Sequence, residues 1–242
     1  MSPEGLPASG HVLLAVRRNI PYSAMHRRNR QPLIVRLDPS IWNSRERIIL
    51  ASKSATRRRL LEQTGIPFKC KIPKTDERAL ELEFLSCGGD IQTLPAILAQ
   101  AKSIDVSRCY PGAMCLGADQ VLILDGRLFH KAETIADAIG SLQELSGRTH
   151  ILISAFAIAR DARVVCDGSD RAAMTMRSLD RDDLALYLLC AGSSVLESVG
   201  AYMFEGAGIH IFEKVVGDSA TILGLPILKV LSGLRREGAL LL

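Results

Sequence analysis

The segment Gly117-Ala118-Asp119-Gln120 sets a carboxylate between two small residues and the apolar run 121–124. A run rich in leucine and β-branched residues favours a strand, so we expect Asp119 at a small-residue bend where that strand begins. A carboxylate at the mouth of a sheet can bind a cation or take a proton, although a strand-edge aspartate often only hydrogen-bonds its own turn. Asp119 is therefore a catalytic candidate that needs partners from elsewhere in the chain.

A second acidic group, Asp76-Glu77, follows a predicted strand at 68–74 that contains Pro73. Adjacent carboxylates after a strand can bind a divalent metal or orient a water molecule. The same pair suits the first turn of a helix, where negative charge is favourable. Both interpretations stay open on the spacing alone.

Two lysines can reach the same region. Lys102 ends a predicted helix, 94–103, where a lysine is commonly solvated or stabilises the last carbonyl groups. Asp125-Gly126 is a strong two-residue hairpin signal between two apolar runs, and Lys131 follows it. The hairpin returns Lys131 toward the strand that carries Asp119, so one site can include both side chains.

Hydroxyls and arginines gather where a short buried strand, 48–51, leads toward a helix predicted over 57–64. The turn between them, 52–56, contains two serines and a threonine, whose hydroxyls and backbone N–H groups can face an anion. Three arginines, 57–59, then occupy the first helical turn, where positive charge opposes the helix dipole. Such a cluster makes sense if a polyanion binds there, and a solvated arginine face is the alternative.

The segment 200–208 is rich in glycine and alanine and also contains Tyr202 and Glu205. Small residues let the backbone approach a flat ligand, and Glu205 can accept hydrogen bonds from the edge of a base. The segment lacks G-x-G-x-x-G and so gives no support for a dinucleotide fingerprint. A tight loop without a ligand is the alternative.

The rest of the chain continues the alternation of strands and helices. Thr134 predicts the N-cap of a helix that ends at Gly147, and residues 180–183 begin an amphipathic helix. His150 is a further general-base candidate, but the five histidines form no metal pattern. The remaining predicted elements are strands at 151–159, 164–166 and 173–177 and a leucine-rich helix at 225–237.

The composition of the chain limits the classes of protein to which it can belong. The chain has 242 residues, 48% of them hydrophobic, enough for a sizeable core. Its six cysteines include no C-x-x-C pair and no secretory signal is evident, so we expect reduced thiols in a cytoplasmic protein. The sequence contains no run of about 18 apolar residues, and we therefore expect no membrane partner.

The net charge of +4 is unevenly distributed. Residues 1–45 hold seven arginines against two acids, a balance of +5, which leaves −1 for the remainder. We therefore divide the chain into a basic, poorly ordered extension, 1–45, dispensable for activity, and a folded domain, 46–242. A nearly neutral body argues against nucleic acid as a partner, because nucleic-acid-binding faces need clustered cations.

In their order and spacing, these segments resemble the Maf family of nucleoside triphosphate pyrophosphatases. The resemblance runs from about residue 47 to the C-terminus and rests on Leu50 to Leu61, Asp76-Glu77, Lys102, Gly117 to Gln120, Lys131, Ser146 to His150, Gly200-Ala201-Tyr202, Glu205-Gly206 and Gly224-Leu225-Pro226. It implies a single α/β domain with a mixed, curved sheet and flanking helices, in which two lobes surround a cleft as in inosine triphosphatase-like folds. It also implies a homodimer.

The resemblance implies hydrolysis of a nucleoside triphosphate to the monophosphate and pyrophosphate with a divalent cation, Mg²⁺ or Mn²⁺. Glu77 and Asp119 would bind the metal and activate or position the attacking water, and which of them takes the proton stays open. The substrate contacts implied in this way come from Ser52, Arg57, Arg58, Lys102, Gln120, Lys131 and Glu205.

Within the family, Gln120, Glu205 and the ending 234–238 look nearer to the branch of 7-methylguanosine triphosphate pyrophosphatases than to the dTTP/UTP branch. A glutamate suits guanine, whose N1–H and N2 amino group form a donor pair. The chain departs from the family pattern at Ala55, Ala132, 153–155 and Ser198. The resemblance therefore supports the reaction type more strongly than the choice of base.

Other classes of function remain as alternatives. Maf proteins are also associated with inhibition of septum formation, and a nucleotide-sensing regulator of cell division would keep the phosphate site without catalysis. A nucleic-acid-binding module would instead bind through residues 1–45 in a salt-dependent manner. Release of pyrophosphate from a panel of nucleotides discriminates between these classes.

Overall fold

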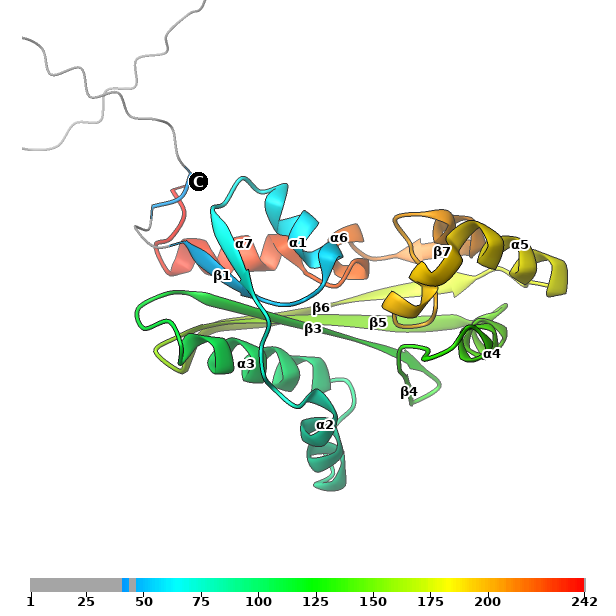
Figure 1. Ribbon diagram of the computed structural model, residues 1–242, viewed down its shortest axis with the longest axis horizontal. Coiled ribbons are helices and arrows are strands. Elements are labelled where there is room, and N and C mark those ends of the chain that lie inside the picture. The colour runs from blue at the N-terminus through cyan, green and yellow to red at the C-terminus, as the bar shows by residue number, and fades with distance from the viewer. Residues whose placement is uncertain (1–40, 44–46, 242) are drawn as a thin grey trace, which may run out of the picture. The chain divides into compact units, whose positions relative to one another are not determined.

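The computed structural model describes residues 41–43 and 47–241, which form a seven-stranded mixed sheet with helices on both faces (Figure 1). The strand order is β2-β1-β3-β5-β6-β7, and β4 pairs with β3. β1 runs parallel to β2 and β3, and the other pairings between these strands are antiparallel. The strands are β1 (Ile48–Ala51), β2 (Phe68–Lys71), β3 (Cys115–Leu124), β4 (Arg127–Phe129), β5 (Thr149–Arg160), β6 (Arg163–Met176) and β7 (Phe212–Val216). The predicted mixed α/β domain is confirmed.

Side-chain caps fix the starts of two helices that the sequence predicts. Thr134 forms a capping box with Asp137 at the start of α4, and Asp180 forms one with Asp183 at the start of α5. The helices are α1 (Ala55–Glu62), α2 (Glu77–Ser86), α3 (Leu94–Ser107), α4 (Ile135–Leu145), α5 (Arg181–Ala191), α6 (Ser219–Ile222) and α7 (Ile227–Arg236), with 3-10 turns η1 (Gly192–Glu197) and η2 (Ala207–Ile211).

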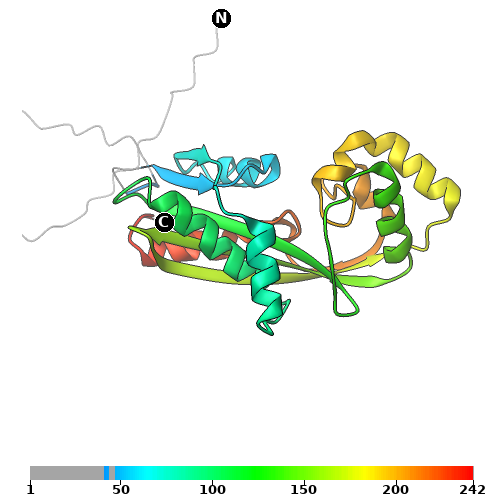
Figure 2. The same ribbon diagram turned by 60° about the horizontal axis from the view of Figure 1, so that its bottom comes forward.

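The long strands β3, β5 and β6 connect two groups of helices. Helices α1 and α7 lie over one face of the sheet, where they and β1 enclose a core that includes Phe156 and Leu234 (Figure 1). Farther along the same strands, α4, α5 and the loop 198–206 enclose a second core that includes Leu142 and Tyr187. We call these the α1 lobe and the α5 lobe. Helix α3 covers the face opposite to α1 and α7 (Figures 1 and 2).

Helix α3 approaches β3 closely at Gly117. A Cβ atom at this position would lie 2.2 Å from the carbonyl oxygen of Ala99 and 2.7 Å from the backbone nitrogen of Ser103, both in α3. Because neither backbone atom can move alone, only glycine permits this approach. The contact brings Lys102, next to Ser103, against the strand that carries Asp119.

Two strand predictions were wrong in extent. Asp119 does not lie at a bend before a strand, because β3 continues back to Cys115 and Asp119 pairs with Ala155 of β5. The runs predicted at 164–166 and 173–177 are one 14-residue strand, β6, which pairs along almost its whole length with β5. The predicted hairpin at Asp125-Gly126 is confirmed as the connection between β3 and β4.

Helix α1 begins at Ala55 and not at residue 57. Ser54 has an extended backbone and its hydroxyl accepts a hydrogen bond from the backbone nitrogen of Arg57, so it caps the helix two residues earlier than predicted.

Residues 41–43 contact the C-terminal end of the domain. Trp42 is buried and forms an antiparallel bridge with Leu240, and the backbone nitrogen of Leu241 donates to the carbonyl of Ile41. Charge alone groups these residues with the basic extension. Residues 1–40 lie outside the described part of the chain, so the predicted division at residue 45 stays a prediction.

Two further expectations concern cysteines and membranes. The six cysteines carry free thiols. Across residues 41–43 and 47–241, the helices lack the length and hydrophobicity that crossing a bilayer requires.

Candidate active site

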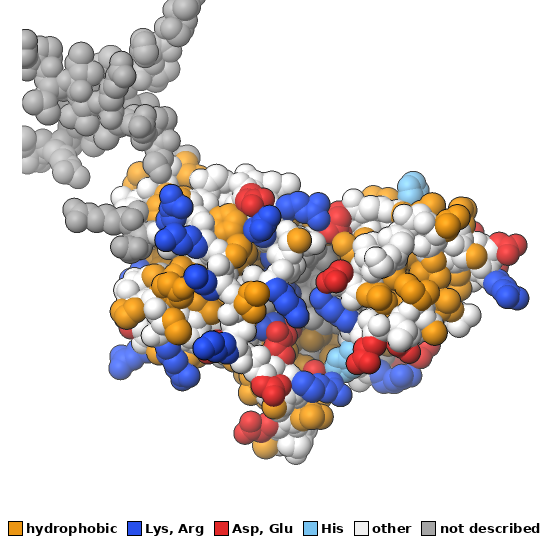
Figure 3. Space-filling view, viewed as in Figure 1, with side chains coloured by type: hydrophobic (Ala, Val, Ile, Leu, Met, Phe, Trp, Pro, Cys, Tyr) orange, Lys and Arg blue, Asp and Glu red, His pale blue; other side chains and the backbone are white. Residues whose placement is uncertain are grey.

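A cleft of about 930 Å³ opens between the α1 lobe and the α5 lobe, over β3. The turn 51–56 and part of α1 line one wall, the loop 198–199 and 202–205 lines the other, and the start of α2 contributes to the rim. Figure 3 shows the surface hollowed between the lobes, with lysine, arginine and carboxylate side chains gathered around the hollow. The arrangement of two lobes around a cleft is thus present.

Lys102 joins the two carboxylates. Its Nζ lies 2.7 Å from Glu77 Oε2 and 2.6 Å from Asp119 Oδ1. Lys102 is 4% exposed and Asp119 is 7% exposed, whereas the Glu77 side chain is 48% exposed. Lys102 is therefore a buried counter-ion in the interior of α3, which continues to Ser107, and the predicted helix end at residue 103 with a solvated lysine was wrong. Through it, α2, α3 and β3 each contribute one charged group to one point.

Asp119 is more basic than an ordinary aspartate. Burial raises its pKa, and the positive charges of Lys102 and Arg57 oppose that rise, while Glu77 adds to it. A buried carboxylate with raised basicity and two cations beside it can accept a proton or share a bound cation. Functional sites commonly contain carboxylates in such surroundings.

Arg57 is the second cation beside Asp119. Its Nε donates to the carbonyl of Gly224 at 2.8 Å and its Nη1 to the carbonyl of Ala118 at 2.9 Å. Burial lowers its pKa, which Asp119 and Glu77 counteract, and a guanidinium stays charged at neutral pH. Gly224 has φ of +92°, a conformation that favours glycine at this contact. Arg57 is thus a positive charge fixed by the backbone.

The turn into α1 lines the cleft and is held by two hydrogen bonds to its own serine hydroxyls. The backbone nitrogen of Ser54 donates to Ser52 Oγ at 3.2 Å, and Ser54 Oγ accepts from the backbone nitrogen of Arg57 at 3.3 Å. Ser52 is buried, and every residue from 51 to 57 lines the cleft. The positive end of the helix dipole and Lys53 therefore lie at the same wall, where they favour an anion.

Lys131 lines the cleft close to Val199, with which its backbone forms an isolated bridge. Burial lowers its pKa, and Arg57 and Lys53 lower it further, while Glu197 and Glu77 oppose the change. The positive charges of Arg57 and Lys53 therefore repel that of Lys131. A polyanion in the cleft would relieve their repulsion.

Gln120 lines the cleft next to Asp119, and its side-chain amide contacts two neighbouring elements, β5 and α6. Its Nε2 lies 3.0 Å from Ser154 Oγ, 3.1 Å from the carbonyl oxygen of Thr221 and 3.0 Å from that of Ile222. Ser154 Oγ also donates to the carbonyl of Thr221 at 2.7 Å. Through these hydrogen bonds, Gln120 of β3 connects to β5 and α6. The same bonds fix the orientation of its side chain in the cleft.

Glu205 lies on the wall opposite to α1 and reaches across to it. Thr56 Oγ1 donates to Glu205 Oε1 at 2.9 Å, and Arg59 Nη2 lies 3.9 Å from the same oxygen. The predicted base acceptor is therefore held by the first turns of α1.

Two sequence candidates lie outside this arrangement. The Arg58 side chain is 60% exposed, pairs with Glu62 at 3.4 Å and does not line the cleft, because the helix turns it away from Arg57. His150 is fully buried beside Phe212, and its Nε2 lies 2.8 Å from the Tyr202 hydroxyl. It does not line the cleft either. Burial lowers its pKa to about 4, as expected of a neutral core histidine.

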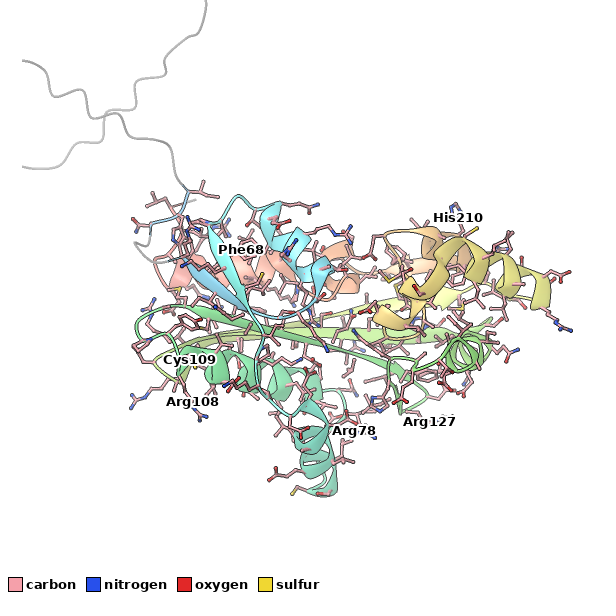
Figure 4. The ribbon with its side chains drawn as sticks, in the orientation of Figure 1. Phe68, Arg78, Arg108, Cys109, Arg127 and His210 are labelled. Atoms are coloured by element: carbon pink, nitrogen blue, oxygen red, sulfur yellow. The ribbon has the colours of Figure 1, made fainter. Side chains whose placement is uncertain are left out.

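Sequence reasoning missed a charged cluster at the rim of the cleft. Arg78 Nη1 donates to Glu81 Oε1 at 2.7 Å, and His130 Nε2 lies 3.5 Å from the same oxygen. Figure 4 shows Arg78 on α2, on the side that faces β4. Arg78 and Glu81 are three residues apart and so lie on one helix face, which is a signal the sequence did carry.

The carboxylates fit a divalent cation as a partial set of ligands. Glu77 and Asp119 converge on one point, since both reach Lys102 Nζ, and carboxylate oxygens suit Mg²⁺ or Mn²⁺. Proteins often bind Mg²⁺ through one or two carboxylates plus substrate phosphates. Within the residues that the structure describes, His, Cys, Asp and Glu form no group of three or more suited to a metal. Further ligands would therefore have to come from a substrate and water.

The family model described as Maf-like protein matches residues 47–237. A 7-methyl-GTP pyrophosphatase from Rhizobium etli is 43% identical over 194 residues, 80% of this chain and 98% of that protein. One from Brucella suis is 45% identical over 79% of this chain and 96% of that protein. A nucleoside triphosphate pyrophosphatase from Nitrobacter winogradskyi is 44% identical over 82% of this chain and 97% of that protein. Among solved structures, a nucleoside-triphosphatase / dITP/XTP pyrophosphatase from Mycobacterium abscessus aligns with a TM-score of 0.32 and 17% identity over 55% of this chain and 76% of that one.

Proposed function

Because the chain belongs to the Maf family, we propose that it hydrolyses a nucleoside triphosphate between the α and β phosphates. The observation that carries this proposal is the buried Lys102, which joins Glu77 and Asp119 inside a cleft lined by cations. Paired carboxylates can position a water molecule and accept its proton, and the cations can offset the negative charge of a triphosphate. The relatives named as pyrophosphatases support the same reaction.

In the proposed reaction, water attacks the α-phosphorus in line with the oxygen that bridges to the β-phosphate. The new P–O bond forms as the bridging P–O bond breaks, and pyrophosphate leaves with the electron pair of that bond. The proton of the water passes to one of the two carboxylates, Glu77 or Asp119. Arg57, Lys102 and Lys131 stabilise the negative charge on the phosphate oxygens.

We include a divalent cation, Mg²⁺ or Mn²⁺, in this proposal. Glu77 and Asp119 would hold it, and when bound it would neutralise phosphate charge and orient the attacking water. The turn 52–56, with Lys53 and the N-terminus of α1, would bind phosphate oxygens through hydroxyls and backbone N–H groups.

We propose that the base of the substrate is 7-methylguanine and that the protein clears 7-methyl-GTP from the nucleotide pool. Glu205 supports this choice, because a carboxylate accepts from the N1–H and N2 amino group of guanine. The relatives named 7-methyl-GTP pyrophosphatases support it too. Gln120 lies beside the reacting end of the cleft in an orientation fixed by α6. Faster turnover of UTP or dTTP than of 7-methyl-GTP would contradict this assignment.

The reaction is tested with a panel of canonical and methylated triphosphates, with Mg²⁺, with Mn²⁺ and with excess chelator. We expect metal-dependent release of pyrophosphate and not of orthophosphate. In water enriched in heavy oxygen, the label should enter the nucleoside monophosphate, since the α-phosphorus is attacked. Label in the pyrophosphate would place the attack on the β-phosphorus and overturn the proposed position of cleavage.

The same panel addresses the alternative of a nucleotide-sensing regulator of septum formation. Nucleotide binding without pyrophosphate from any substrate would favour the sensor and sink the enzymatic proposal. A homodimer and a cytoplasmic location belong to the proposal as well. Light scattering coupled to size-exclusion chromatography tests the first, and cell fractionation tests the second.

A further inference from the structure

We propose that Thr56 and Arg59 are positioning residues for base selection, because they hold the Glu205 carboxylate in one place from across the cleft. This inference rests on the proposed function and deepens it. It assigns a role in choosing the substrate to two side chains of α1 that contribute nothing to the carboxylate pair at Asp119.

The contact joins the two lobes. Thr56 and Arg59 belong to α1, whereas Glu205 belongs to the α5 lobe, 149 residues from Thr56 along the chain. Thr56 Oγ1 donates to Glu205 Oε1 at 2.9 Å, and Arg59 Nη2 lies 3.9 Å from that oxygen. All three residues line the cleft. Both contacts use the same oxygen, so they restrain one end of the carboxylate and leave Oε2 to face other groups.

The backbone that carries Glu205 is already rigid. The backbone nitrogens of Gly206 and Gly208 both donate to the carbonyl of Met203 at 3.0 Å. A Cβ atom on Gly208 would lie 2.5 Å from the same carbonyl oxygen, so the turn is closely packed. What stays free is the glutamate side chain, which has three rotatable bonds and loses entropy when it is ordered. Thr56 and Arg59 restrict those bonds before a base arrives.

The contact contributes too little to stability to be explained as a fold restraint. The Arg59 side chain is 62% exposed, and an ion pair in such surroundings typically contributes about 0–1 kcal/mol. Glu205 is less exposed, at 25%, because it lies against the cleft wall. The geometry therefore has more effect on where the carboxylate oxygens lie than on whether the domain folds.

A fixed carboxylate discriminates between bases. Guanine offers two adjacent donors, N1–H and the N2 amino group, which can both reach one carboxylate. Uracil and thymine offer a single N–H between two carbonyl oxygens, and those oxygens would meet the negative charge. A glutamate free to rotate could avoid that repulsion, whereas one held by Thr56 and Arg59 cannot. Selectivity for guanine over uracil should therefore depend on these two residues.

The test compares Thr56→Val, which keeps the shape and removes the hydroxyl, with Thr56→Ser, which keeps the hydroxyl. We measure kcat/KM for 7-methyl-GTP and for UTP. For Thr56→Val we expect the ratio of kcat/KM for 7-methyl-GTP to that for UTP to fall by about five- to tenfold, the effect of losing one hydrogen bond of typical net strength. Thr56→Ser should keep the ratio within about twofold. Arg59→Met should lower the ratio, and Arg59→Lys should restore part of it because the charge returns.

Three outcomes would overturn the inference. The first is a change in kcat/KM by the same factor for both nucleotides in Thr56→Val, which a purely structural role predicts. The second is an equal rise in kcat for both nucleotides, which would mean that the contact slows opening of the cleft. In a Glu205→Gln background, finally, Thr56→Val should have no further effect on the ratio. An undiminished effect there would show that Thr56 acts without Glu205.

A second readout separates this inference from the proposed function. Equilibrium binding of 7-methyl-GMP and UMP requires no turnover, and the ratio of their dissociation constants should shift in the same direction in Thr56→Val. If the unaltered protein releases no pyrophosphate from any nucleotide, the proposed reaction fails while the binding ratio still decides the role of Thr56. If turnover is normal and both ratios are unchanged, the reaction stands and the positioning role fails.

Discussion

Lys102 Nζ lies 2.6 Å from Asp119 Oδ1, and both groups are almost entirely buried although they belong to different elements, α3 and β3. Breaking a buried pair by removing one partner is costly, because the other charge is left without compensation. Lys102 also opposes the rise in the pKa of Asp119 that burial causes. The proposed catalytic role of Asp119 and the stability of the domain therefore depend on the same contact.

Asp119→Asn should reduce kcat by at least about a hundredfold with the fold intact, because the change removes charge and basicity but not volume. Steady-state kinetics and circular dichroism measure the two effects. Asp125→Asn is the matched control, since Asp125 lies in the β3–β4 turn, pairs with Arg148 and does not line the cleft. Near-normal turnover in Asp119→Asn would remove Asp119 from the mechanism.

Lys102→Met should lower the free energy of unfolding by about 3–5 kcal/mol at neutral pH, since Asp119 then stays buried without its nearest cation. Lys102 lowers the pKa of Asp119, so the variant should have a higher pKa there. Protonation then removes the uncompensated charge, and the loss relative to the unaltered protein should shrink as pH falls. Urea denaturation across a pH series measures this. A loss that does not vary with pH would contradict the account.

Gly117→Ala should destabilise the protein by about 1–3 kcal/mol, because the new methyl group would overlap backbone atoms of α3. It should also lower turnover, since α3 carries Lys102. The matched control is Gly140→Ala in the interior of α4, where no atom lies within 4 Å of the added carbon. That control should stabilise by about 0.5–1 kcal/mol through helix propensity. Equal effects at the two glycines would argue against close packing at Gly117.

His150 should make the fold sensitive to acid. Its pKa is lowered to about 4 from an ordinary 6.5, so the unfolded chain binds a proton that the folded chain refuses between these values. Stability is full above about pH 6.5 and falls by roughly 3 kcal/mol as pH drops to about 4. His150→Gln should lose this component, whereas His210→Gln, at an exposed position, should keep it. Parallel pH profiles for the unaltered protein and His150→Gln would refute the prediction.

Arg57→Met should lower kcat/KM by at least about a hundredfold, as for loss of a donor that stabilises transition-state charge. Arg58→Met should change it by less than about twofold, because its side chain is exposed and paired with Glu62. Thermal melting of both variants controls for loss of fold. Equal losses of activity would support the sequence-based assignment of both arginines to phosphate binding.

The sequence predicts the elements of this fold well because their signals are local. The hairpin at Asp125-Gly126, the cap at Thr134 and the cap at Asp180 each depend on a few adjacent residues, and all three are present. The extent of β3 and β6 was harder to predict, since pairing with β5 extends both strands through residues with little strand propensity of their own.

The site shows the limit of local signals. Lys102 shares a helix face with the buried Leu94 and Leu98, but the carboxylates that pair with it come from α2 and β3, through the approach at Gly117, and no local signal predicts them. The difference between Arg57 and Arg58 depends on which face of α1 packs against the rest of the domain, and Arg57 lies four residues before the buried Leu61, on the same face. The hydrogen bond from Thr56 to Glu205 joins residues 149 positions apart, and sequence spacing does not predict contacts at that separation.

The strand that bears Asp119 belongs to neither wall of the cleft. β3, β5 and β6 run beneath both lobes, while the proposed base acceptor, Glu205, belongs to a loop of the α5 lobe. The carboxylate pair joined by Lys102 and the proposed base acceptor therefore belong to separate parts of the molecule. Under the proposed function, the loop around Glu205 can change to suit a new nucleobase while the carboxylate pair stays as it is, so one scaffold can serve a range of nucleotides.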